Sequence, residues 1–157
     1  MSNFYVSDGQ PNPLGATIGL GGCNFAVHCP SADGVEICLF DKNTEEQLAA
    51  IVMPAKTGKI WHCQLDDIQA GQLYGYRVIG ENHAHMGLKF DHQKLLVDPY
   101  AKALNKPAVW NKTQYEGDSQ FMVPKGIVQD SEAKLQKIQK PQTPLDQTVI
   151  YETHVKG

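Results

Sequence analysis

The pattern of apolar and polar residues along the chain predicts short β-strands. Within residues 60–65 every second position from Trp61 onward is apolar, and within residues 74–79 every second position from Tyr74 onward is aromatic or β-branched. Successive side chains of a strand point to opposite faces, so this spacing predicts two strands that each bury one side. The connection between them, residues 66–71, is short and carries turn residues, which predicts a β-hairpin at the centre of an antiparallel sheet.

Further apolar runs recur at a spacing of roughly ten residues, with turn residues between them. They predict strands at residues 24–29, 35–40, 48–53 and 94–97. The second of these runs is largely apolar on both faces. Short strands at such a spacing are typical of a β-sandwich. Because no helical pattern interrupts the strands up to Gly80, we expect an all-β fold.

Length and charge restrict the classes of partner. The 157 residues suffice for one domain with a real core. The net charge of −3 and the scattered basic residues predict no binding to nucleic acid or to an anionic membrane surface. We find no apolar run of about 18 residues, which a membrane helix would need. The start of the chain lacks a secretory signal, so we expect a cytoplasmic protein unless a signal was removed.

The cysteines do not follow a metal-binding pattern. The chain has 4 cysteines without CxxC spacing and two His-Cys dipeptides, at residues 28–29 and 62–63. Adjacent residues of a strand point to opposite faces, so neither dipeptide supplies two ligands to one ion. We therefore expect no metal site, and we interpret Cys38 and Cys63 as small buried residues. The glycine cluster at residues 19–22 precedes no helix, so we also expect no dinucleotide or other cofactor.

The sequence contains no recognisable catalytic constellation. Asp66 and Asp67 are the obvious pair of carboxylates. Neighbours in a connection point apart into solvent, whereas retaining glycoside hydrolysis needs two carboxyl groups about 5 Å apart. No nucleophile with its base and no phosphate-binding loop accompanies them, so we predict no catalytic residue in this chain.

Seven segments together carry a family resemblance that none of them would establish alone. They are residues 13–17 (PLGAT), 24–27 (NFAV), 35–41 (VEICLFD), 61–62 (WH), 71–78 (GQLYGYRV), 94–102 (KLLVDPYAK) and 148–157 (TVIYETHVKG). In this order they resemble the amino-terminal part of bacterial glycogen-debranching enzymes of the isoamylase and pullulanase type. The resemblance extends over nearly the whole chain.

The resemblance implies a domain organisation and a parent activity. Residues 1–10 would be a lead-in, and residues 11–105 an immunoglobulin-like β-sandwich of the early-set type from carbohydrate-binding family forty-eight. Residues 106–147 would be an irregular linker, and residues 148–157 the first strand of a catalytic (β/α)8 barrel that this chain does not complete. The parent enzymes hydrolyse α-1,6 branch linkages in glycogen and limit dextrins. We therefore expect a non-catalytic module of glycogen breakdown.

Glycan binding requires exposed aromatic faces that stack on sugar rings. The candidates are Trp61, Tyr74, Tyr76 and Trp110. The first three lie on predicted buried faces, which favours packing, whereas Trp110 lies in a polar stretch and would be exposed or in contact with the barrel. Glycogen-binding members of the family carry a lysine and a second tryptophan after the position of Tyr74. This chain has Gly75 and a tryptophan-free loop at residues 81–87 instead.

Three functions remain open at this stage. The module packs on its own catalytic barrel and helps to shape the cleft, or it binds α-glucan by itself, or it is an unrelated immunoglobulin-like interaction domain. The departures at Gly75 and in the following loop favour the first function. A barrel-packing surface would expose apolar residues around positions 94–102. The candidate interface residues are Leu95, Leu96, Asp98, Pro99 and Tyr100.

We predict that the chain alone releases no sugar from a branched glucan, because it lacks the pair of carboxyl groups that hydrolysis needs. A reducing-sugar assay of the purified chain with glycogen limit dextrin measures this directly. Release above the enzyme-free blank would contradict the prediction.

Overall fold

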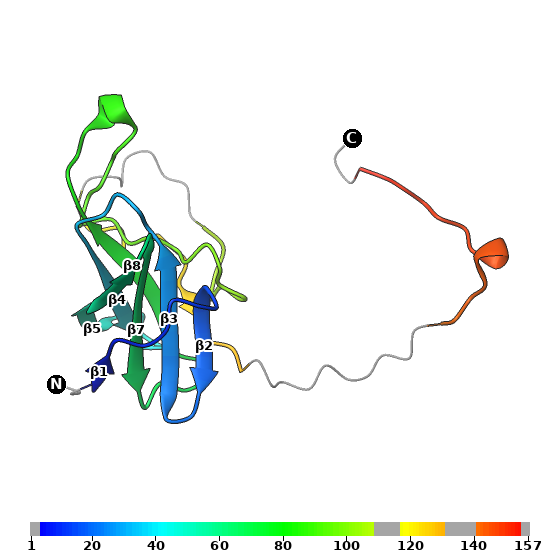
Figure 1. The fold of residues 1–157 in the computed structure, drawn as a ribbon, viewed down its shortest axis with the longest axis horizontal. Helices are drawn as coiled ribbons and strands as arrows, with labels where there is room; N and C mark the ends of the chain where they lie inside the picture. Colours follow the sequence, from blue (N-terminus) through cyan, green and yellow to red (C-terminus); the bar gives the residue numbers. More distant parts are fainter. Residues whose placement is uncertain (1–3, 109–116, 131–140, 155–157) are drawn as a thin grey trace.

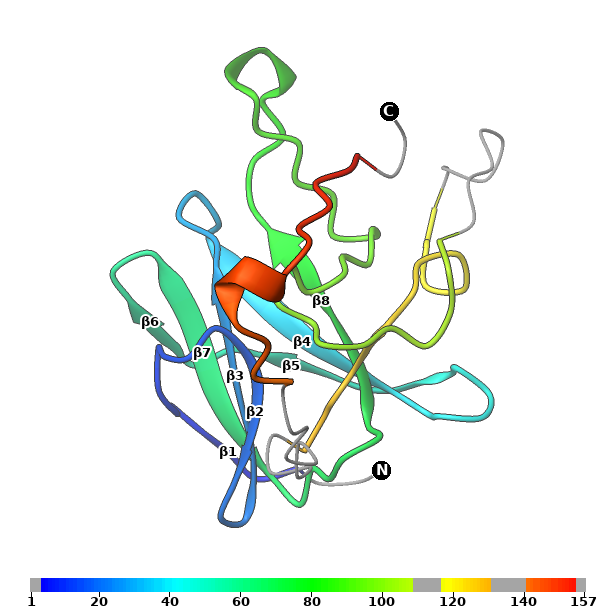
Figure 2. The same ribbon diagram turned by 90° about the vertical axis from the view of Figure 1, so that its right-hand side faces the viewer.

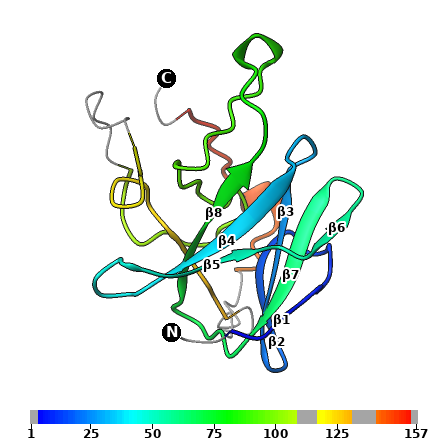
Figure 3. The ribbon, with the colours of Figure 1, turned by 90° about the vertical axis from the view of Figure 1, so that its left-hand side faces the viewer.

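Two antiparallel sheets pack face to face. The structure, a computed structural model, describes residues 4–108, 117–130 and 141–154. One sheet has the strand order β1-β7-β3-β2, and β6 pairs with another part of β7; the other sheet has the order β5-β4-β8-β9. Figures 1 and 3 show the two layers, and in Figure 1 the loop that carries the 3-10 turn η1 (Ala84–Met86) projects from one end of the sandwich.

The strands are short, as in most sandwiches. The sheet of β7 contains β1 (Val6–Ser7), β2 (Gly15–Gly19), β3 (Gly22–His28), β6 (Ala55–Thr57) and β7 (Ile60–Asp66). The sheet of β8 contains β4 (Gly34–Phe40), β5 (Gln47–Val52), β8 (Leu73–Ile79) and β9 (Gly126–Ile127). The prediction of an all-β sandwich is confirmed, and strands β3, β4 and β5 coincide closely with the predicted runs.

The main core lies between the sheets because alternate residues of the central strands point inward. Phe25, Ile37 and Leu65 are 0% exposed. The ring of Tyr74 meets that of Phe25 edge-on, with 5.1 Å between the ring centroids. The inward residues of β7 and β8 are those that the period of two assigned to the buried faces.

A second, smaller core lies on the outer side of β4 and β8. Cys38 and Phe40 point away from the main core, yet both are 0% exposed. Leu73 and Leu95 complete this cluster, with Val123 and Ile127 packed against it. Leu95 and Val123 thus cover part of the outer face of this sheet, which explains why β4 is apolar on both sides. Figure 2 shows the yellow-green part of the chain beside β8.

The predicted β-hairpin is wrong. β7 and β8 exist at the expected residues, but β7 pairs with β3 whereas β8 pairs with β4. Residues 67–72 cross from one sheet to the other, and the backbone N–H of Asp67 donates to the carbonyl of Gly21 at 2.9 Å. Alternation identifies a buried face, but it does not say to which of two facing sheets a strand belongs.

The C-terminal half differs from the expectations in two ways. Residues 94–97 form an isolated bridge, between Leu96 and Tyr76, instead of a strand. The stretch predicted as a linker supplies β9 to the sheet. Residues 148–154, expected to be the start of a barrel strand that this chain does not complete, lie outside both sheets: after the 3-10 turn η3 (Leu145–Gln147), Ile150 and Tyr151 are 77% and 88% exposed. An apolar stretch that is strand-like in sequence adopts a strand only where a partner edge is available.

We expect Leu95→Ala to lower the free energy of unfolding by about 2–4 kcal/mol, because it leaves a cavity in the small core that Leu95 forms with Cys38, Phe40 and Leu73. Leu96→Ala is the matched control: Leu96 is 45% exposed whereas Leu95 is 2% exposed. The control should cost less than about 1 kcal/mol. Urea unfolding of both variants tests this, and equal losses would contradict the second core.

Candidate functional site

Trp61 is a packed residue with one polar tether. It lies in β7, half-buried against the main core. Its indole N–H donates to the carbonyl of Cys29 at 3.1 Å, and Lys56 Nζ lies 4.8 Å from the ring centroid. The lysine occupies one face of the ring, so Trp61 offers less surface for stacking on a sugar than a free aromatic platform does.

Tyr74 and Tyr76 belong to the main core. They are 1% and 2% exposed, and their rings meet edge-on with 6.0 Å between centroids. A buried ring presents no face to a sugar, so the packing interpretation holds for both, and as sugar-stacking residues both candidates are withdrawn. The fourth aromatic candidate, Trp110, lies outside the described residues.

Gly75, which follows Tyr74 and faces outward from β8, is covered by Leu95 and Leu96. A Cβ added to Gly75 would lie 3.0 Å from Leu95 Cδ1 and 3.1 Å from the carbonyl oxygen of Leu96. The backbones of Tyr76 and Leu96 exchange two hydrogen bonds, of 2.8 and 2.9 Å, beside this contact. A long side chain has no room at residue 75 while residues 95–96 pair with β8.

Asp98 anchors the loop that follows. It is 2% exposed, and its carboxylate accepts hydrogen bonds from the Tyr74 hydroxyl at 2.7 Å and from the backbone N–H of Tyr100 at 2.8 Å. Burial raises the pKa of Asp98, whereas these hydrogen bonds partly oppose the rise. Burial likewise raises the pKa of Tyr74. Asp98 therefore fixes the loop from inside and is not itself part of a surface.

The remaining interface candidates are exposed. Leu96 and Tyr100 are 45% and 48% exposed, Pro99 is also exposed, and Leu104 in the same segment is 47% exposed. We call these four residues the 96–104 surface. Tyr100 lies against β2, since a Cβ added to Gly15 would be 3.0 Å from Tyr100 Cβ. Of the five predicted interface residues, three are exposed, whereas Leu95 and Asp98 support them from beneath.

The chain leaves the sandwich beside the 96–104 surface. Leu104 forms a bridge with Gly126, and the N–H of Ile127 donates to the carbonyl of Ala103 at 2.9 Å. Val128 then bonds to the 71–72 backbone, after which the described part of the module ends at Asp130. Figure 1 shows both segments on the same side of the sandwich.

A buried lysine holds β9 in place, and sequence reasoning missed it. Lys125 is 0% exposed, and its ammonium donates to Glu45 at 2.6 Å and to the carbonyls of Gln120 and Val123. Lys106 donates to the same Glu45 carboxylate, also at 2.6 Å. Burial lowers the pKa of Lys125, while Glu45 opposes the change. Because 80 residues separate Lys125 from Glu45, no local pattern reveals the pair.

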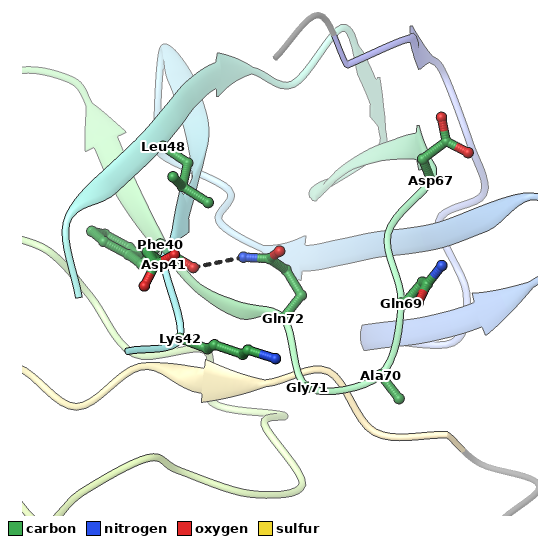
Figure 4. A pocket seen from close by; sticks show the side chains of 9 residues that line it. All are labelled: Phe40, Asp41, Lys42, Leu48, Asp67, Gln69, Ala70, Gly71 and Gln72. Carbon is green, nitrogen blue, oxygen red and sulfur yellow. Dashed lines mark hydrogen bonds between the residues drawn. The ribbon is translucent and has the colours of Figure 1, made fainter. Parts of the chain in front are cut away.

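A pocket of about 330 Å³ lies between the β4–β5 turn and the 67–72 crossover, as Figure 4 shows. The side-chain amide of Gln72 donates to the carbonyl of Phe40 at 2.8 Å, and the Phe40 ring is buried. The rest of the lining includes the charged residues Asp41, Lys42 and Asp67. With its aromatic ring covered and its central amide engaged, the pocket offers no platform for a sugar, and we assign it no ligand.

Comparison with known proteins identifies relatives over most of the chain. The glycogen debranching enzyme of Pectobacterium atrosepticum is 42% identical over 159 aligned residues, covering 97% of this chain and 24% of that protein. The glycogen debranching enzyme of Yersinia enterocolitica is 40% identical with the same coverage. The chain thus spans 24% of the length of these relatives.

Solved structures give the same picture. The catalytic module of the glycogen-degrading pneumococcal virulence factor SpuA aligns with a TM-score of 0.56 and 25% identity, over 78% of this chain and 17% of that one. A pullulanase from Anoxybacillus aligns with a TM-score of 0.53 and 26% identity, over 76% of this chain and 14% of that one.

The fold defines an immunoglobulin-like β-sandwich module, as expected. Residues 13–101 match the family described as carbohydrate-binding module 48 (isoamylase N-terminal domain). The chain belongs to this family, and the resemblance to glycogen-debranching enzymes is confirmed.

Two properties concern only the part of the chain that the structure describes. No group of three or more His, Cys, Asp and Glu side chains there is arranged to hold a metal ion. The same residues contain no helix of the length and apolarity that crossing a membrane requires.

We predict that Asp98→Asn changes how stability depends on pH. The folded-state pKa of Asp98 is raised above 3.8, the value in the unfolded chain. The contribution of Asp98 to the free energy of unfolding is therefore fully present below pH 3.8, and it is lost as the pH rises through the folded-state pKa. The free energy of unfolding of the native chain, minus that of the variant, should fall as the pH rises above 3.8 through the folded-state pKa. Denaturant unfolding across this range measures it.

Asp118→Asn is the control of opposite sign. Burial of Asp118 opposes ionisation, but the hydrogen bonds from Arg77 Nη2 to both carboxylate oxygens, at 2.8 and 2.9 Å, the Gln120 N–H and the nearby positive charges together lower the pKa of Asp118. The same difference should therefore rise with pH for this variant. A flat difference for Asp98→Asn would mean that the carboxylate is not buried in solution.

Proposed function

We propose that this chain is the non-catalytic N-terminal module of a cytoplasmic glycogen-debranching α-1,6-glucosidase, and that it packs on the catalytic barrel of its own protein. Two relatives with this enzyme name support the proposal, and the chain corresponds to 24% of their length. Residues 148–157 are then the first strand of the barrel. The exposed Val149, Ile150 and Tyr151 are side chains that such a strand would bury in its sheet.

The observation that carries the packing role is the position of the 96–104 surface. Monomers seldom leave neighbouring large apolar side chains half exposed without a partner. Here they lie beside β9, from which the chain continues toward the next domain. Because both domains lie in one chain, that domain is present at a high effective concentration at this surface, so even a modest apolar contact would hold the two together.

Glucan binding by aromatic stacking has less support. Both candidate tyrosines are buried, Trp61 is capped by Lys56, and Leu95 closes the outer position at Gly75. A direct contact with α-glucan would therefore use hydrogen bonds on another part of the module. Family membership speaks against an unrelated interaction domain.

The test is a chimera in which this chain replaces the aligned 24% of the Pectobacterium atrosepticum enzyme. The double variant Leu96→Ser, Tyr100→Ser removes apolar contact area worth about 2 kcal/mol if both side chains are buried against the barrel. We expect the chimera to unfold at a temperature a few degrees lower and to lose debranching activity. In the isolated chain the same changes should cost less than about 1 kcal/mol.

Val52→Ser is the matched control, since Val52 is an apolar residue of β5 that is 56% exposed. It should leave the chimera unchanged in melting temperature and activity. If the double variant behaves as this control does, the 96–104 surface does not pack on the barrel.

A further inference from the structure

A row of uncharged polar side chains crosses the outer face of the sheet that contains β1, β7, β3 and β2. In the strand register, Ser7 of β1 lies opposite Gln64 of β7, Gln64 opposite Asn24 of β3, and Asn24 opposite Thr17 of β2. Directly opposed residues of antiparallel strands point to the same face. The core residues Cys63 and Leu65 flank Gln64 in sequence, so this row points outward.

The lead-in forms a wall over one part of this face. The backbone N–H of Gln10 donates to Asn24 Oδ1 at 2.7 Å, and Asn24 Nδ2 donates to the carbonyl of Gln10 at 3.0 Å. His62, the next outward residue of β7, is bonded to the carbonyl of Asp8 at 2.7 Å and to Thr57 Oγ1 at 2.8 Å. Two tethers therefore hold residues 8–10 in a fixed position on the sheet.

Between this wall and β2 lies a pocket of about 480 Å³. Its lining consists of Ser7, Gly9, Gln10, Asn12, Pro13, Thr17, Ile18, Gly19, Asn24 and Gln64. None of these residues carries a charge, in a chain in which 20% of residues do. Hydroxyl and amide groups line it together with the apolar Pro13 and Ile18. The volume lies within the range of roughly 300–1,000 Å³ that is usual for small-molecule sites.

Two groups in the row are available to a ligand. Among the described residues, neither the Gln64 amide nor the Thr17 hydroxyl has a side-chain hydrogen-bond partner, whereas Asn24 is engaged with Gln10. An amide offers both donors and an acceptor, and a hydroxyl offers one donor with acceptor capacity. A sugar hydroxyl needs the same mixture, whereas an ionic ligand would need an opposite charge that the pocket lacks.

We propose that this pocket is a binding site for a neutral sugar unit of an α-glucan, recognised by hydrogen bonds from Gln64 and Thr17 instead of by aromatic stacking. The choice of α-glucan rests on the proposed function, whereas the neutral polyhydroxylated character of the ligand rests on the lining itself. Asn24 and its bond to Gln10 hold the site in shape before the ligand binds, which lowers the cost of ordering it.

The test uses the ¹⁵N-labelled chain titrated with maltotetraose, followed through its amide chemical shifts. We expect shifts centred on Thr17, Asn24 and Gln64. The double variant Thr17→Val, Gln64→Leu keeps side-chain size but removes the hydrogen bonds, and should weaken binding about tenfold or more. Raising the salt concentration should leave the affinity of the native chain unchanged, because no charge takes part.

Gln47→Leu is the matched control, an exposed glutamine on β5 of the other sheet, and it should bind as the native chain does. Binding that the double variant retains, with shifts centred elsewhere, would overturn the pocket while leaving glucan contact by the module in place. Absence of binding up to the solubility limit of the sugar would overturn the site as well. The packing role is tested separately in the chimera, so either failure is distinguishable from failure of the proposed function.

Discussion

The arrangement of the module depends on one buried hydrogen bond, from the Tyr74 hydroxyl to the Asp98 carboxylate. The ring of Tyr74 belongs to the core between the sheets, whereas Asp98 belongs to the segment that contacts Gly15 of β2 through Tyr100 and bridges Gly126 of β9 through Leu104. A buried carboxylate without such partners would be costly, so the bond and the Tyr100 N–H together determine where residues 98–100 lie. The exposure of Tyr100 is a consequence of the burial of Asp98.

Residues 95–100 favour packing on a catalytic barrel and disfavour stacking on a glycan, the two roles considered for this module. Leu95 fills the small core over β4 and β8 and thereby places Leu96 on the surface, next to the point where the chain leaves. In doing so it covers the position after Tyr74, which would have to be open for a long polar side chain to reach a sugar from this face. In this chain, that part of the face is occupied by Leu95 and the backbone of Leu96, so a glycan cannot stack there.

Sequence reasoning predicted what depends on local alternation. The period of two around Trp61 and Tyr74 located β7 and β8 and their buried faces, and the apolar positions on both sides of residues 35–40 indicated the covered strand β4. It did not predict that β7 and β8 lie in different sheets, because a turn and a crossover have the same turn residues. Nor did it predict the bonds of Lys125 to Glu45 or the row from Ser7 to Thr17, since both depend on contacts between residues far apart in the chain.

Leu95 and Val123 cover part of the outer face of β4 and β8, and the 96–104 surface is apolar. The outer face of the sheet that contains β7 is instead polar along its central row. Its central row is neutral because the side chains that form it are hydroxyls and amides, which carry no charge. Neutrality matters for a partner such as glycogen, which carries no charge: a charged group in the pocket would lose hydration without gaining a counter-charge. Hydrogen bonding from a rigid sheet avoids that loss, and in the proposed enzyme a weak contact of this kind would gain strength from a second contact made by the barrel with the same polymer.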